Sequence, residues 1–119
     1  MNNHQIKKQF DLEERTFEFA KNIRFFLKTF KRTYLNSSDI DQLIRSSGSV
    51  AANYVEANEA LSRKDFLNRI KICRKEAKES LLWLNLLVID DKYEQSHQSL
   101  LKECTEIMKI FGAIVSKIQ

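Results

Sequence analysis

The sequence predicts an all-α protein, an antiparallel up-down-up-down four-helix bundle built from a single domain. Its 119 residues include no proline and only two glycines, whereas sandwiches, barrels and alternating α/β folds need turn residues at short intervals. Apolar residues recur at spacings of three and four along four long segments, which is the repeat of one helix face. Short connections join these segments, so consecutive helices are expected side by side and antiparallel.

The first helix is expected over residues 11–33, after a polar N-terminal arm of residues 1–10 that we predict to be flexible. Leu12, Phe19 and Phe26 mark the seven-residue apolar repeat of this helix. Acidic residues begin the segment and basic residues end it, which is the polarity that a helix dipole favours.

The second helix is expected over residues 39–60, with Ser38 as its N-cap because a Ser-x-x-acid pattern begins there. Small residues around Gly48 interrupt its apolar pattern over residues 45–49. Either the helix kinks at this point or the small side chains let another helix approach closely. We favour close approach, because helical spacing continues on both sides.

The third and fourth helices are expected over residues 63–90 and 94–118, and Ser62 precedes the third in a second Ser-x-x-acid pattern. The C-terminal half of the third helix is apolar on nearly every side. That half is therefore expected deep in the bundle or in a subunit interface. Its large apolar residues are Leu82, Trp83, Leu86 and Leu87.

Two cysteines, Cys73 and Cys104, lie on apolar helix faces and are expected to be small, reduced core residues. The N-terminal segment lacks the pattern of a secretory signal, and no apolar run reaches the roughly 18 residues of a membrane-spanning helix. We therefore expect a soluble cytoplasmic protein that does not engage membranes.

The sequence contains no pattern that predicts catalysis or metal binding. His97 and Cys104 share a helix face, but they stand about 10 Å apart, too far to hold one ion without other elements. The serines at 46, 47 and 49 lack both a local histidine and the glycines of a nucleophile elbow. We expect no enzymatic activity, metal, cofactor or small-molecule substrate.

Charge is distributed unevenly along the chain, which has 20 basic and 16 acidic residues and a net charge of +4. Helical spacing gathers basic residues into two ridges, one on the first helix and one on the third. Such ridges are typical of surfaces that bind nucleic-acid phosphates, but they also occur as ordinary solvated faces, and Glu76 and Glu79 reduce the charge near the third-helix ridge. The ridges are Lys21, Arg24, Lys28 and Lys31, and Lys64, Lys71, Lys75 and Lys78.

A polar cluster lies among small apolar residues on the second and third predicted helices. Because buried polar groups need partners, we interpret it as a hydrogen-bonded network that sets helix register or a subunit contact. The alternative is a ligand pocket. The cluster consists of Arg45, Asn53, Glu56, Glu76 and Glu79.

A resemblance to a known family extends from about Phe17 to the C-terminus. It is most specific in IRSSGSVAANYVEANEA over residues 44–60 and in SRKDF over residues 62–66, followed by Glu76, Glu79, Trp83-Leu84 and Leu87. In these stretches the chain resembles the bacterial 23S rRNA intervening-sequence protein family. Many relatives have Pro and Gly where this chain has Ala52 and Ala57, which predicts a straighter second helix.

The resemblance implies a bacterial four-helix bundle that assembles as a ring-like homopentamer. A structurally similar pentameric accessory protein of diversity-generating retroelements binds nucleic acid through a basic surface. We therefore hypothesise a non-enzymatic homo-oligomer that binds RNA or DNA non-specifically through its basic ridges. The alternative is an assembly scaffold or protein-interaction module, in which basic and acidic segments of neighbouring subunits pair and no nucleic acid binds.

Overall fold

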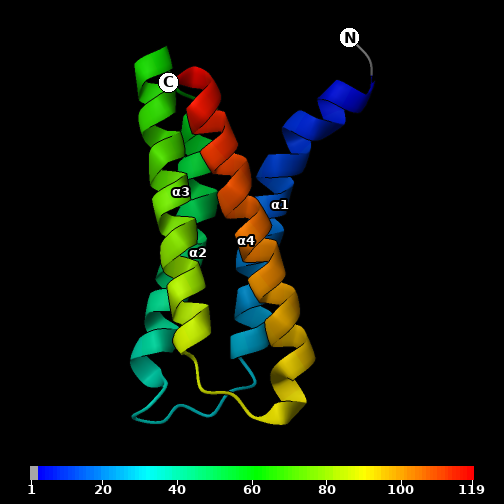
Figure 1. Cartoon of the computed structure of the whole chain (residues 1–119), viewed down its shortest axis with the longest axis vertical. Coiled ribbons are helices and arrows are strands. Elements are labelled where there is room, and N and C mark those ends of the chain that lie inside the picture. The colour runs from blue at the N-terminus through cyan, green and yellow to red at the C-terminus, as the bar shows by residue number, and fades with distance from the viewer. Residues whose placement is uncertain (1–2) are drawn as a thin grey trace.

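The computed structural model describes the backbone of residues 3–119 and the side chains of residues 12–119, and the described part is all-α as predicted. Four long helices run alternately down and up the molecule, which measures 47 × 28 × 20 Å (Figure 1). A short 3-10 turn, η1, precedes the last helix. The elements are α1 (Asn3–Leu27), α2 (Ser37–Asn58), α3 (Arg63–Leu86), η1 (Asp91–Tyr93) and α4 (Glu94–Ile118).

Helices α1 and α3 lie diagonally across the bundle. Each packs against both α2 and α4, and among the described residues no Cα atom of α1 lies within 8 Å of a Cα atom of α3. Figure 1 shows α3 and α1 on opposite sides of the molecule, with α2 and α4 between them. The outward faces of α1 and α3 therefore look in opposite directions.

The core is formed by the apolar faces that the sequence repeat predicts. Phe19, Ile70 and Phe111 are fully buried, from three different helices. Cys73 and Cys104 are free and fully buried, which confirms that they are small core residues. Their thiols donate to backbone carbonyls of neighbouring helices, and burial raises the pKa of each thiol to about 12.

Helix α1 begins at Asn3, so residues 3–10, predicted as an arm, have helical backbone. Residues 1 and 2 lie outside the described residues, as do the side chains of the arm. Figure 1 shows the first turns of α1 leaning away from the other helices. Leu12 is partly buried against the core, and the packed part of α1 starts near it.

The end of α1 differs from the prediction, because the helix stops at Leu27 and not at residue 33. Beyond Leu27 the chain turns, and Phe30 packs its ring 4.6 Å from that of Tyr93. The Asn36 carboxamide holds the connection by accepting a 2.8 Å hydrogen bond from the Thr33 amide. The packing of Phe30 against Tyr93, more than sixty positions away, therefore ends α1, although the apolar repeat of the sequence continues beyond Leu27.

The two Ser-x-x-acid patterns behave differently. Ser62 caps α3 as predicted, with its hydroxyl accepting a 3.0 Å bond from the Asp65 amide. The prediction for Ser38 is wrong, because α2 already begins at Ser37 and Asn36 occupies the N-cap. Asn36 has near-helical backbone angles, so the chain enters α2 without the extended residue that a side-chain cap requires.

Helix α3 ends at Leu86, four residues before the predicted end at residue 90, whereas α4 has the predicted bounds. The Leu84 carbonyl near this end accepts a 2.7 Å hydrogen bond from Nε2 of the buried His97 on α4. A carbonyl in the last turn of a helix has no intrahelical partner, so His97 satisfies it from the neighbouring helix.

The small residues of α2 mark a close approach, as predicted, and the helix runs through them without a break. The buried hydroxyls of Ser46 and Ser80 share a 2.7 Å hydrogen bond between α2 and α3. On the α1 side, a Cβ at Gly48 would lie 3.0 Å from the guanidinium of Arg24. Small side chains therefore let α2 meet both neighbours at this level.

Among the described residues, none of the helices has an apolar stretch of the length needed to cross a lipid bilayer.

Candidate nucleic-acid interface

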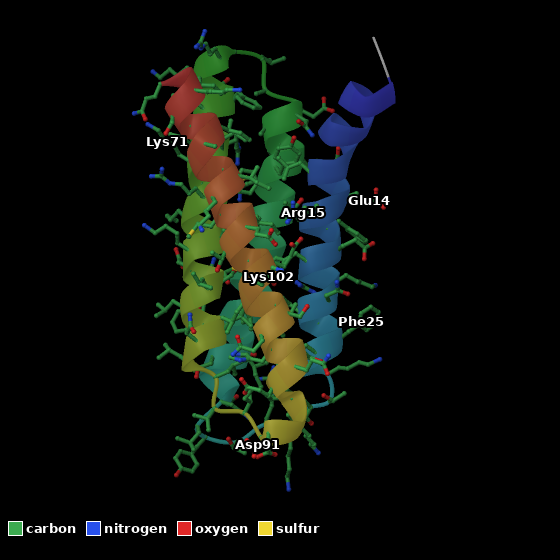
Figure 2. All side chains as sticks on the ribbon, turned by 45° about the vertical axis from the view of Figure 1, so that its right-hand side comes forward. Glu14, Arg15, Phe25, Lys71, Asp91 and Lys102 are labelled. Carbon is green, nitrogen blue, oxygen red and sulfur yellow. The ribbon has the colours of Figure 1, made fainter. Side chains whose placement is uncertain are left out.

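The basic ridge of α3 is intact in the structure. All four of its lysines are solvent-exposed along the outer face of the helix, over a length of about 21 Å at 1.5 Å per residue. Figure 2 shows the Lys71 side chain pointing away from the bundle on this flank. The lysines are Lys64, Lys71, Lys75 and Lys78.

The two carboxylates beside the middle of this ridge are turned toward α2, where Arg45 forms an ion pair with each of them. Arg45 Nη1 lies 2.9 Å from Glu76 Oε2, and Arg45 Nη2 lies 2.9 Å from Glu79 Oε1. These two carboxylates raise the pKa of Arg45, and the hydrogen bond to Glu76 is the largest cause. Glu76 and Glu79 therefore reduce the charge of the α3 ridge less than their positions in the sequence suggest.

Three of the five residues of the predicted polar cluster lie together in the structure, and the other two lie apart. Arg45, Glu76 and Glu79 form a network joining α2 to α3, and the Glu76 side chain is only 5% exposed. Asn53 lies outside this network, and its side-chain Oδ1 accepts a 2.9 Å hydrogen bond from Arg69 of α3. Glu56 is exposed, and its side chain makes no hydrogen bond or ion pair with the described residues.

The predicted ridge of α1 is broken at Arg24. Its guanidinium points across the bundle surface to α2, where Nη2 donates a 3.1 Å hydrogen bond to the Ile44 carbonyl. The guanidinium lies beside Gly48, where a Cβ atom would crowd it. Lys31 lies beyond the end of the helix. The remaining lysines, Lys21 and Lys28, hold their ammonium groups 5.6 and 5.1 Å from the centre of the Phe25 ring, which is 51% exposed.

The two predicted ridges cannot form one surface within a single chain, because α1 and α3 are diagonal. Figure 2 shows Phe25 and Lys71 on opposite flanks of the bundle. The α3 flank presents a row of lysines, and the α1 flank presents an aromatic ring with two lysines.

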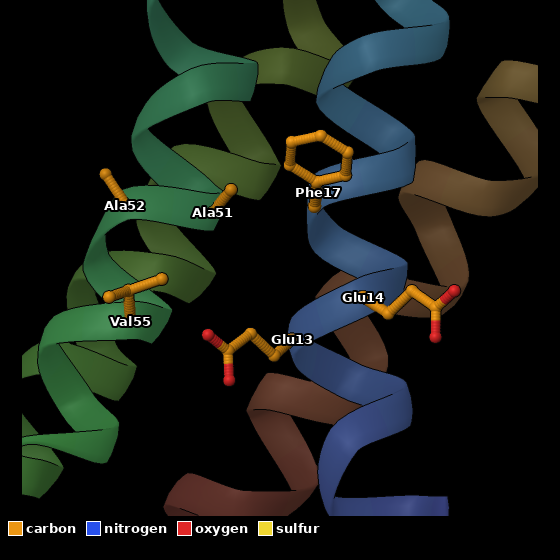
Figure 3. A pocket seen from close by; sticks show the side chains of 6 residues that line it. All are labelled: Glu13, Glu14, Phe17, Ala51, Ala52 and Val55. Atoms are coloured by element: carbon orange, nitrogen blue, oxygen red, sulfur yellow. The ribbon is translucent and has the colours of Figure 1, made fainter.

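A groove of ≈ 620 Å³ between α1 and α2 has a different character. Figure 3 shows Phe17 and Glu13 of α1 pointing toward Ala51 and Val55 of α2. Glu14 is a further lining residue. The groove is thus apolar with carboxylates at its rim, and that charge disfavours binding of phosphates.

Sequence reasoning missed one ion pair that positions α1 against α4. Arg15 binds Glu103 through two parallel hydrogen bonds of 2.8 and 2.7 Å. The two residues are 88 positions apart, so no local pattern could have signalled the pair. The burial of His97 could be predicted in part, because this residue shares a helix face with apolar residues.

Only part of the C-terminal apolar segment of the predicted third helix lies in the bundle core, and the rest is the part that the predicted subunit interface would cover. Leu87 is buried and Trp83 is partly buried, but Leu82 and Leu86 are 49% and 50% exposed. The described side chains also contain no group of three or more His, Cys, Asp or Glu arranged to hold a metal ion.

Comparison with known proteins agrees with this architecture. The family model described as 23S rRNA-intervening sequence protein matches residues 8–113. A crystal structure from Bacteroides thetaiotaomicron, described as a protein of unknown function from the S23 ribosomal protein family, is similar with 32% identity and a TM-score of 0.73. The match covers 87% of this chain and 97% of that one. No curated protein matches the sequence. The extent of the family match, together with the four-helix fold, shows that the chain belongs to the 23S rRNA-intervening sequence protein family.

Proposed function

We propose that this protein is a non-enzymatic, cytoplasmic homo-oligomer that binds RNA or DNA non-specifically through phosphate contacts. The observation that carries the proposal is the α3 ridge, which exposes four lysines while the neighbouring carboxylates are paired with Arg45. Ammonium groups that meet phosphates displace condensed counterions, which gives affinity without sequence preference. The lysines bind as point charges, so the ridge has no means of direct base recognition.

Exposed apolar side chains on two separate flanks support the homo-oligomeric part of the proposal. Phe17 and Val55 border the α1–α2 groove, whereas Leu82 and Leu86 lie on α3 below the lysines. Contacts between two different faces of identical subunits close into rings when the rotation permits. The family resemblance implies a ring of five.

Charge reversal on the ridge tests the proposal. The double variant Lys71→Glu/Lys75→Glu is expected to lose most of the affinity for an RNA hairpin and for a DNA duplex, because two phosphate contacts become repulsive. Lys102→Glu/Lys109→Glu makes the same change of net charge on the exposed face of α4 and serves as the control. Equal binding by both variants would contradict the role of α3.

A second candidate function is an assembly scaffold that binds no nucleic acid. It is favoured by the carboxylates of Glu13 and Glu14 at the rim of an apolar groove, to which the lysines of a neighbouring subunit's α3 are complementary. The same variants separate the two functions when oligomeric mass is measured. Under the scaffold function, Lys71→Glu/Lys75→Glu dissociates the oligomer, whereas nucleic-acid binding predicts an intact oligomer.

A further inference from the structure

A second groove, of ≈ 510 Å³, lies between α1 and the beginning of α4 on the flank opposite the α3 ridge. Its lining combines a half-exposed aromatic ring and an aliphatic side chain with amides and hydroxyls. Phe25 and Leu100 supply the apolar part of the lining, and the polar part consists of Asn22, Gln95, Ser96 and Ser99.

The charge around this groove differs from that of its neighbours. None of its lining residues is a carboxylate, and Lys21 and Lys28 hold their ammonium groups beside the Phe25 ring. By contrast, Glu13 and Glu14 line the α1–α2 groove. A further α1–α4 groove adjoins this one and shares Asn22, Ser99 and Leu100 with it. That groove is lined by three glutamates and one lysine, which are Glu18, Glu103, Glu106 and Lys102. An anionic ligand on this flank is therefore attracted to the Phe25 end of α1.

The combination matches the parts of an unpaired nucleotide. A base has apolar faces that stack on aromatic rings, and a polar edge that pairs with amides and hydroxyls. Asn22, Gln95 and the two serines each donate and accept hydrogen bonds, so they suit more than one base. Lys21 and Lys28 are exposed, and their flexible side chains can turn from the ring to a phosphate on either side of the base.

We propose that this groove binds one unpaired base of a single-stranded nucleic acid, with Phe25 stacking on the base and Lys21 and Lys28 contacting the flanking phosphates. The inference rests on the proposed function, because its ligand is nucleic acid, but it assigns a separate site with a different requirement. A base inside a duplex is already stacked and paired, so this site selects single strands, whereas the α3 ridge also accepts duplexes.

The test compares two exposed aromatic residues in the full-length protein. Phe25→Ala removes the stacking ring, and Tyr34→Ala removes a 94% exposed ring from the connection between α1 and α2, which lines none of the three grooves described above. Binding of fluorescently labelled rU12, dT12 and a DNA duplex is measured by anisotropy. Phe25→Ala is expected to weaken single-strand binding about tenfold and leave duplex binding unchanged, while Tyr34→Ala changes neither. The ratio of rU12 to dT12 affinity shows whether the site prefers RNA.

The outcomes separate the two proposals. If the duplex binds and Phe25→Ala has no effect on single strands, or the same effect as Tyr34→Ala, the base site is refuted and the phosphate-binding ridge stands. If Phe25→Ala weakens duplex and single strand equally, the site is not selective for unpaired bases and the inference fails. If the wild-type protein binds none of the three probes at low salt, both proposals fail. Circular dichroism of each variant verifies that the fold is retained.

Discussion

Truncation of Arg45 is the perturbation whose cost the structure defines best. Arg45→Ala removes two charge-assisted hydrogen bonds of 2.9 Å and leaves the Glu76 carboxylate, 5% exposed, without its partner between α2 and α3. Breaking a fully buried ion pair costs about 3–5 kcal/mol, whereas an exposed pair contributes at most about 1 kcal/mol. Because the Arg45 side chain is 48% exposed, we place the loss between these limits, at about 2 kcal/mol.

Thermal unfolding followed by circular dichroism measures this loss. A chain of this length has an unfolding entropy that converts 1 kcal/mol into about 4 °C, so the Tm of Arg45→Ala should fall by about 8 °C. The control is Arg32→Ala, which removes the exposed ion pair of 2.8 Å with Asp41 and two hydrogen bonds to Ser37, and which should lower the Tm by no more than about 4 °C. Adding Glu76→Gln to Arg45→Ala removes the buried charge and should restore part of the stability.

The reasoning fails if Arg45→Ala unfolds at the temperature of the wild-type protein, or if its Tm falls no further than that of Arg32→Ala. It also fails if Glu76→Gln lowers the Tm further in the Arg45→Ala background. Either result would mean that water, and not Arg45, compensates the Glu76 charge.

Two further predictions concern buried groups. His97→Phe keeps an aromatic ring but removes the hydrogen bond to Leu84, so the free energy of unfolding should fall by about 1–2 kcal/mol in a urea titration; an unchanged midpoint would show that the bond contributes nothing. The thiols of Cys73 and Cys104, with pKa values raised to about 12, should resist a thiol reagent at pH 8 until the protein is denatured. Since the unfolded chain releases these protons near pH 9, they should also make stability fall as the pH rises from about 9 to about 12, and Cys73→Ala/Cys104→Ala should flatten that fall.

Local sequence predicts helix ends only where local interactions determine them. Ser62 has extended backbone angles and caps α3 through an amide three residues away, so its pattern was sufficient. Ser38 has the same pattern, yet α2 begins one residue before it, at Ser37. The reason is the preceding connection, in which Asn36 accepts a hydrogen bond from the Thr33 amide. The end of α1 depends on the packing of Phe30 against Tyr93, which no local pattern contains.

The same distinction applies to the candidate interface. The α3 ridge was predictable because the apolar repeat of a helix also determines which residues face outward. The contact of Arg24, an exposed residue of the α1 ridge, with the Ile44 carbonyl beside Gly48 could not be predicted, because it joins two helices. The groove beside Phe25 joins residues of α1 and α4 that are about seventy positions apart, so it becomes visible only in the folded chain.

The most direct test of the account is the salt dependence of nucleic-acid binding, recorded with the oligomeric mass of the same sample. Affinities for an RNA hairpin and a matched DNA duplex are measured across a salt series. If all four α3 lysines meet phosphates, log affinity should fall linearly with log salt, with a slope of about −3.6 per subunit engaged on duplex DNA. The oligomer should persist throughout the series. Absence of binding even at low salt, or an affinity independent of salt, would contradict the account.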